Sequence, residues 1–414
     1  MDGVRVVRPD RTQLLLQPCC LEELLPDDHP ARVIWAVVEH LDLSAFYAEI
    51  AALTDSAGRP AIDPRLLVAL WLYATQQGIG SGRELARLCT EHDAYRWLCG
   101  GLAINYHTLN DFRVAHDAAL DQLMTQVLTA LVHQGLVRVE CIAQDGTRVR
   151  AAAGRSSFRR KDTLLRLRDE IAGHVRRVKQ DLDAPARERR EGTRRATAKL
   201  ARVNAALDTI EELSAAKARQ KNKPSKHTAP RASTTDPEAR WMRLGDGGFG
   251  PAYNIQTAVD VDSRAIVGVA VTNAGSDANE SEPMRRQVEA RTGGRVRTHL
   301  LDGGYKNLDA VERAEAAGVR IFMPPPVPKS AAPPGARRPG DGPGVVRWRR
   351  RMAQPASDKT YRLRASTAET VHADLKTHRG LHRLAVRGLR KIRCVALWAA
   401  LTYNVLHFGS YLSG

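Results

Sequence analysis

The spacing of apolar residues changes near residue 137, and this change limits the folds that are open to the chain. Residues 19–136 repeat apolar side chains at helical spacing, most clearly at 66–73, where they form one face of a helix. Beyond residue 137, short runs rich in β-branched residues are typical of strands. The sequence therefore predicts a mixed α/β fold, with an all-helical N-terminal domain at 1–136 and a mixed domain at 137–414.

Helix-start signals divide the N-terminal part into short helices. Asp63-Pro64 combines a capping residue with a first-turn proline. Ser81 to Glu84 form a capping box, and Thr108 to Asp111 form a weaker one. A longer helix is expected at about 114–135. Such a module is typical of helix-turn-helix DNA binders, but a packing or dimerisation bundle has the same signals, so both interpretations stay open.

The mixed domain is predicted to contain short strands that are far apart in sequence. The second and third strands form a hairpin around residues 262–264, and a helix at 307–317 that ends at Gly318 separates the last two. The expected strands lie at 137–143, 253–261, 265–273, 297–301 and 319–323.

Two segments interrupt this domain. Residues 155–230 contain 21 Lys or Arg residues and 10 Asp or Glu residues, so this segment supplies +11 of the chain's net charge of +17. We expect a basic helical insertion at 155–233, made of two long helices that pair antiparallel, followed by a flexible stretch at 218–233. The second interruption, at 324–344, is rich in Pro and Gly and predicts an irregular loop. The positive charge favours nucleic acid as a partner, with acidic membranes second.

Other signals narrow the class of protein. Residues 1–18 lack the apolar core of a signal peptide, and the apolar run at 395–412 contains polar residues, so we interpret it as a buried helix and expect no membrane span. The six cysteines and thirteen histidines show no metal-ligand spacing. We expect a cytoplasmic, bacterial protein without zinc.

Two aspartates stand in the same local context. Asp145 and Asp302 each follow a short apolar strand, and each precedes a glycine. Ligands of α/β sheets bind at strand ends, and glycine leaves room for a metal ion or a phosphate. A small set of carboxylates suits Mg²⁺. Asp-Gly after a strand is also a common turn, and this alternative stays open for each aspartate.

A third candidate segment lies at 361–376. Ser366 or Thr367 is expected to cap a helix that carries Glu369. Lys376 follows seven residues later, two turns along the same helical face. A carboxylate directed at metals and a cation directed at phosphates would then share one surface, although an ordinary exposed amphipathic helix has the same pattern.

These segments resemble the three catalytic blocks of DDE transposases. The blocks are 145–151, 301–305 and 361–376. More narrowly, they are similar to bacterial insertion-sequence transposases with a Tyr/Arg/Glu/Lys signature in the third block. One departure is that four residues separate Arg364 from Glu369, where many relatives have three. Further similar stretches bring the resemblance to most of the chain: 58–113, 155–160, 236–240 and 253–256.

The resemblance implies a ribonuclease-H-like catalytic domain, with Asp145 on the first strand, Asp302 on the fourth and Glu369 on a later helix. These three residues would be catalytic and would hold two Mg²⁺ ions, which Mn²⁺ can replace. In-line attack would cut a DNA strand and then join it to target DNA. Residues expected to bind the DNA are Arg148, Tyr361, Arg364, Lys376, Arg387 and Lys391.

The implied partners are the double-stranded DNA of transposon ends and target, bound by a homodimer at the bacterial nucleoid. Two alternatives stay open: a domesticated DNA-binding protein that no longer cuts, and a metal-dependent nuclease of the same fold. Other carboxylates compete for the metal role, namely Asp260, Asp262, Asp277 and Glu312. The first two are explained by the expected hairpin turn.

Overall fold

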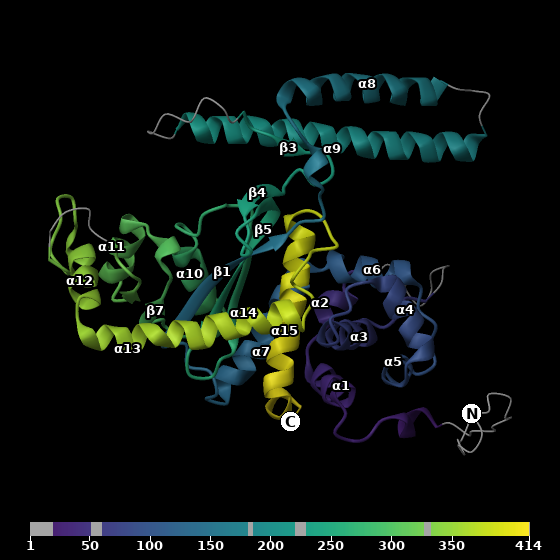
Figure 1. Cartoon of the computed structure of the whole chain (residues 1–414). Helices are drawn as coiled ribbons and strands as arrows, with labels where there is room; N and C mark the ends of the chain where they lie inside the picture. Colours follow the sequence, from purple (N-terminus) through teal and green to yellow (C-terminus); the bar gives the residue numbers. More distant parts are fainter. Residues whose placement is uncertain (1–19, 51–59, 181–184, 220–228, 327–332, 414) are drawn as a thin grey trace, which may run out of the picture.

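The computed structural model describes residues 20–50, 60–180, 185–219, 229–326 and 333–413. Residues 1–18, which are predicted to lack a signal peptide, lie outside these described residues. So do residues 58 and 59 of the resembling stretch, most of the predicted flexible stretch (220–228) and part of the predicted Pro/Gly-rich loop (327–332). The described chain combines helices with a mixed sheet, as predicted (Figure 1).

The N-terminal part is helical, as predicted. Its helices are α1 (Pro30–His40), α2 (Ser44–Tyr47), α3 (Pro64–Gln76), α4 (Gly82–Glu91), α5 (Asp93–Cys99), α6 (Tyr106–Ala115) and α7 (Asp117–His133), preceded by the 3-10 turn η1 (Leu21–Leu24). The predicted caps of α3 and α4 are confirmed, because Asp63 accepts from the backbone of Arg65 and Ser81 from that of Glu84.

The predicted cap at Thr108 is wrong. The cap of α6 lies three residues earlier, at Asn105, whose side chain accepts from the backbone N–H of His107 at 2.8 Å, and the helix begins at Tyr106. Asn is as good a capping residue as Thr. Leu109 and Phe112 lie on the buried face of α6.

The sheet is formed by β1 (Cys141–Arg150), β4 (Arg240–Arg243), β5 (Phe249–Asp260), β6 (Ile266–Thr272), β7 (Thr298–Leu300) and β8 (Arg320–Phe322). The strand order is β4-β5-β1-β7-β8, and β6 also pairs with β5. Strands β1, β5 and β6 are antiparallel neighbours, whereas β7 and β8 run parallel to β1. The predicted hairpin is β5–β6. The helices α10 (Ser281–Thr292) and α11 (Leu308–Ala316) lie beside the sheet (Figure 1).

The end of β1 differs from the prediction. The strand continues to Arg150, and Asp145 lies inside it, paired with Thr257 of β5. The turn interpretation of Asp145 is therefore wrong. The parallel neighbour β7 ends at Leu300, opposite Ala143. Asp145 thus lies two residues beyond the last residue of β1 that pairs with β7, so β1 has no strand partner on that side at Asp145.

The basic insertion forms the predicted pair of long helices, α8 (Lys161–Gln180) and α9 (Ala186–Ala218), which stand away from the sheet (Figure 1). Their apolar contacts form a small separate core around Leu164 and Val203. At its base, β2 (Phe158–Arg159) pairs with β3 (Ala232–Ser233).

The C-terminal helix α15 (Leu389–Leu412) is buried, as predicted for its apolar run. It contacts both parts of the chain: Trp398 donates to the Arg113 carbonyl of α6 at 3.0 Å, and Asn404 bonds both backbone groups of Ile266 in β6. One hydrophobic core spans the N-terminal helices, the sheet and α15. Within the described ranges, no helix has the length and apolarity needed to cross a bilayer.

Candidate active site

The segment that carries Glu369 consists of successive helices. The helix α12 (Pro343–Met352) leads to α13 (Pro355–Arg364), which continues through a π-helical turn (Ala365–Glu369) into α14 (Thr370–Thr377). The predicted cap is wrong, because Ser366 and Thr367 instead donate back to the Leu363 carbonyl at 3.1 and 2.7 Å. A π-turn holds one residue more than an α-turn. It coincides with the additional residue between Arg364 and Glu369.

Asp145 faces two basic side chains, those of Arg364 and His372. Its Oδ2 lies 3.4 Å from Nη1 of Arg364 and 3.7 Å from Nδ1 of His372, and its Oδ1 accepts from the Gly146 N–H at 2.8 Å. Burial raises the pKa of Asp145, but the nearby His372 side chain and the charge of Arg364 lower it by a larger amount. The net pKa is below the ordinary value, so this carboxylate is an anion at neutral pH.

Asp302 lies two residues beyond the end of β7, the parallel neighbour of β1, and not on a strand as expected. Its Oδ1 accepts from the Gly304 N–H at 2.8 Å, which caps the 3-10 turn Gly303–Tyr305. Burial raises the pKa of Asp302, and the negative charges of Asp145 and Asp277 raise it further. Asp145 and Asp302 therefore interact electrostatically across the β1–β7 pair, as carboxylates that share a cation site do.

Glu369 is connected to Asp145 by an ion pair that both carboxylates make with Arg364. The Arg364 Nη2 lies 2.9 Å from Oε1 of Glu369, so its guanidinium bridges Glu369 and Asp145. The Glu369 side chain is 57% exposed and that of Arg364 only 13%. Among the residues that the structure describes, no three His, Cys, Asp or Glu side chains lie close enough together to hold a metal ion.

A cavity of about 710 Å³ opens beside these groups. Asp145, Glu369 and Lys376 line it together, so the carboxylate and the cation of the third segment face the same space. Burial lowers the pKa of Lys376, and the charge of Asp145 partly offsets this effect. The remaining lining residues are Gly146, Thr147, Arg148, Arg243, Leu244, Gly245, Gly275, His372 and Ala373.

Sequence reasoning missed a buried polar cluster under this cavity. The Asp277 carboxylate is 4% exposed and accepts from Asn254 and Gln256 at 2.6 Å each, and from Arg148 at 2.5 Å. Tyr305 donates to Gln256. The available signal was polar residues at alternate positions in an otherwise apolar strand, which places both amides on one face of β5.

Gly146 has a different role from the one expected. It lies in the extended strand, and a Cβ atom there would collide with the Gln256 amide and lie 2.6 Å from Oδ1 of Asp277. The space beside Gly146 is therefore filled by the polar cluster. Gly303, by contrast, has nothing within 4 Å of its Cβ position.

Two of the competing carboxylates have structural partners. Asp260 accepts from the backbone and the hydroxyl of Ser263, which fixes the β5–β6 turn. Glu312 accepts from the N–H groups of Gly344 and Val345 at the start of α12. These contacts account for both carboxylates, whereas Asp277 is part of the polar cluster.

The residues expected to bind DNA fall into two groups. Arg148 and Lys376 line the cavity, and the Tyr361 ring lies 6.0 Å from the guanidinium of Arg364. Arg387 and Lys391 lie outside the cavity lining; Arg387 donates to the Ala152 carbonyl at 3.2 Å, beyond the end of β1.

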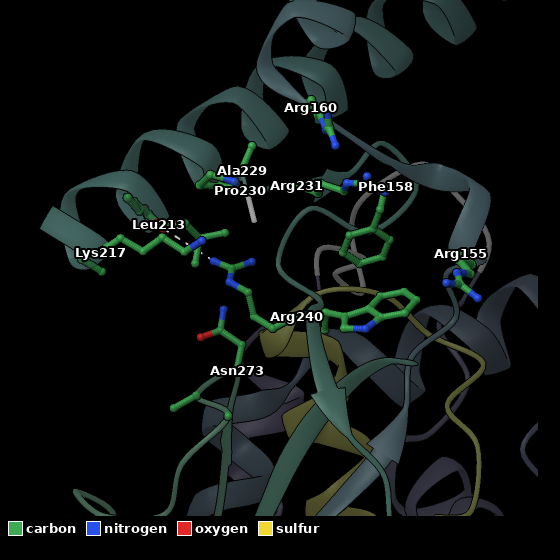
Figure 2. Close-up of a pocket in the computed structure, with 15 residues that line it drawn as sticks. Arg155, Phe158, Arg160, Leu213, Lys217, Ala229, Pro230, Arg231, Arg240 and Asn273 are labelled. Carbon is green, nitrogen blue, oxygen red and sulfur yellow. Dashed lines mark ion pairs between the residues drawn. The ribbon is translucent and has the colours of Figure 1, made fainter. Parts of the chain in front are cut away.

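A second cavity, of about 830 Å³, lies at the base of the basic insertion (Figure 2). Phe158 and Trp241 meet edge to face in its wall, and Arg155 lies over the Trp241 ring. Gly275 lines both cavities, so the two adjoin. The cations around the second cavity are Arg155, Arg160, Lys217, Arg231 and Arg240.

Comparisons with known families now define the class of this protein. A family described as "Transposase domain (DUF772)" matches residues 19–115, and the "Transposase DDE domain" family matches residues 227–405. Together these matches cover more than half of the chain. No curated protein and no solved structure matches it.

The chain is a DDE transposase, an enzyme that catalyses DNA cleavage and strand transfer. Its pair of domains identifies it further as a transposase of the insertion-sequence type. Asp302 and Glu369 lie within the DDE match, whereas Asp145 lies between the two matched regions. Enzymes of this family generally use divalent metal ions.

Proposed function

We propose that this transposase binds the terminal repeats of its insertion sequence, cuts them in a Mg²⁺-dependent reaction and joins them to target DNA. Asp145, Asp302 and Glu369 are the proposed catalytic residues. The observation that supports this proposal is that Asp145 and Glu369, from distant segments, line one cavity together with Arg148 and Lys376, while Asp302 lies near enough to interact electrostatically with Asp145.

The sheet supports a ribonuclease-H-like catalytic domain. Apart from the short strand β4, its order is three antiparallel strands (β6, β5, β1) followed by two that run parallel to β1 (β7, β8). Asp145 lies on the first of these five strands along the chain, and Asp302 lies two residues beyond the end of the fourth. This agrees with the arrangement implied by the resemblance. The domain division at residue 137 remains part of the proposal.

The donor chemistry fits the proposed metal ions. Carboxylate oxygens are hard ligands that suit Mg²⁺ or Mn²⁺. Asp145 lies on β1, and Asp302 lies just beyond the end of the neighbouring strand β7. Two such ions, when bound, activate the attacking hydroxyl and stabilise the leaving oxygen of an in-line displacement. The chain's own contribution is to supply these carboxylates and to hold the scissile phosphate with Lys376 and Arg148.

The +11 charge of the insertion is proposed to hold DNA beside this site. The cations of the second cavity lie at the junction of the insertion and the sheet (Figure 2). The charged helices α8 and α9 extend from there (Figure 1). Phosphate contacts of this kind position DNA without reading its sequence. Arg387 and Lys391, which lie outside the cavity lining, are also proposed to contact DNA phosphates.

A salt titration tests this role. The double variant Arg155→Gln, Arg160→Gln is expected to bind a duplex of the element's end more weakly than the unchanged enzyme. The slope of log K against log salt should fall by about 2, because each lost phosphate contact removes about 0.9. Fluorescence anisotropy measures both quantities. The matched control, Arg286→Gln, Arg313→Gln on α10 and α11, removes the same charge; an equal loss there contradicts a specific role of the insertion.

Incubation with DNA tests the whole proposal. A supercoiled plasmid that carries both ends of the element should be nicked at those ends in Mg²⁺, and the cut ends should become joined to a second DNA molecule. Cutting without joining favours the nuclease alternative. Binding without cutting favours the domesticated DNA-binding alternative. Sequencing the junctions identifies the joined strands.

By resemblance, we also propose that a homodimer holds the two ends and that the enzyme acts in the bacterial cytoplasm at the nucleoid. The N-terminal helices are proposed to take part in end binding. Light scattering of the enzyme with and without end duplexes tests the stoichiometry; one chain per two ends contradicts the dimer.

A further inference from the structure

We infer that Arg364 is an internal counter-ion, which occupies the space between Asp145 and Glu369 in the metal-free enzyme and leaves it when a divalent cation binds. This inference rests on the proposed function, because it assumes that these carboxylates hold the metal. It adds a second role to the DNA contact expected for Arg364: the same guanidinium changes partners when the site is loaded.

The contacts of Arg364 place its charge where a cation would bind. Nη1 lies 3.4 Å from Oδ2 of Asp145, and Nη2 lies 2.9 Å from Oε1 of Glu369. A guanidinium and a divalent cation repel each other and cannot both lie between the same two carboxylates. The described carboxylates themselves do not lie closely enough together to hold a metal ion in this arrangement. Metal binding therefore requires Arg364 to move.

The π-turn makes this contact possible. Arg364 and Glu369 are five residues apart, and in a regular α-helix such residues point to different sides, because each residue rotates by about 100°. A π-turn pairs residue i with residue i+5. The turn at Ala365–Glu369 therefore places Glu369 beneath Arg364. With three residues between them, as in many relatives, the two positions already share one face of an α-helix, so the π-turn offsets the additional residue of this chain and keeps the two side chains together.

The surroundings explain why a counter-ion is needed and why it can be displaced. Asp145, Asp302 and Asp277 bring their negative charges together, and these charges raise the pKa of Asp302. An added cation stabilises such a group. The hold on Arg364 is incomplete, however: its buried Nε and Nη1 atoms find no hydrogen-bond acceptor within the described part of the chain.

The experiment measures metal binding without DNA. The full-length enzyme is titrated with Mn²⁺, and the electron paramagnetic resonance signal of free Mn²⁺ gives the dissociation constant. Arg364→Gln is expected to bind Mn²⁺ about three- to fivefold more tightly than the unchanged enzyme, because no partly exposed ion pair has to be broken. The matched control Arg362→Gln removes the same charge from an exposed position of the same helix and should change the constant by less than twofold.

Unchanged or weaker Mn²⁺ binding by Arg364→Gln overturns the inference, since it makes Arg364 either a pure DNA contact or a support of the metal site. If circular dichroism shows that Arg364→Gln does not fold, Arg364→Lys replaces it. Lysine keeps the charge but cannot bridge two carboxylates, so tighter binding is again expected and its absence overturns the inference. Asp302→Asn reports on the proposed function separately: wild-type Mn²⁺ affinity in that variant contradicts the metal site itself.

Discussion

Replacement of Asp145 by asparagine is expected to abolish strand cleavage in Mg²⁺ while DNA binding stays close to that of the unchanged enzyme. Asparagine keeps the shape of the side chain but removes the negative charge that the proposed metal site needs. Metal stabilisation of a transferring phosphate is worth several kcal/mol, so the cleavage rate should fall by about 10³-fold or more. Nicking of an end-carrying plasmid measures the rate, and anisotropy of a labelled end duplex measures binding.

The matched control is Asp262→Asn, which removes the same charge from an exposed residue in the β5–β6 turn. Its cleavage rate should stay within about twofold of the unchanged enzyme, as for most surface substitutions. An Asp145→Asn enzyme that nicks within tenfold of the wild-type rate would remove Asp145 from the active site. A loss of DNA binding together with cleavage would instead indicate a folding defect.

The second large effect is expected at Gly146, where alanine should destabilise the protein by about 1–3 kcal/mol through overpacking. The new methyl group would collide with the Gln256 amide, which Asp277, Gln144 and Tyr305 hold in place. Because these bonds fix the amide, it cannot move aside without breaking buried hydrogen bonds. Chemical denaturation monitored by circular dichroism measures the free energy of unfolding.

The chain provides a matched glycine for this test. Gly303 follows Asp302 as Gly146 follows Asp145, yet the space beside it is open. Gly303→Ala should therefore change the free energy of unfolding by less than about 0.5 kcal/mol. Equal effects of the two substitutions would mean that the polar cluster under Gly146 is looser than its contacts indicate. The comparison separates two Asp-Gly pairs that look identical in the sequence.

Local signals were sufficient for much of the fold. The caps at Asp63 and Ser81, the hairpin around residues 262–264 and the paired helices of the insertion each depend on neighbouring residues, and each is present. The end of β1 was not predictable in this way, because distant β5 extends the strand past Asp145. Register with a far segment overrides the local Asp-Gly turn signal.

In the candidate site, too, features that depend on neighbouring residues were predicted and features that depend on distant residues were not. Asp145, Asp302, Glu369 and Lys376 were found from their local contexts and from resemblance. Asp277 was seen only as a competing carboxylate, because its amide partners lie on β5, more than twenty residues away. The π-turn was missed because Ser366 and Thr367 suggested a helix start. Their hydroxyls instead bond within a helix that had already begun.

The C-terminal helix α15 has a consequence for damaged copies of the gene. Its side chains complete the same core that holds the N-terminal helices and the sheet. A copy that stops before residue 389 would leave both apolar surfaces exposed, and we expect its product to aggregate or be degraded. Such a copy would then not yield a stable DNA-binding fragment that competes for the element's ends, so decayed copies of this element would not silence an intact one by that route.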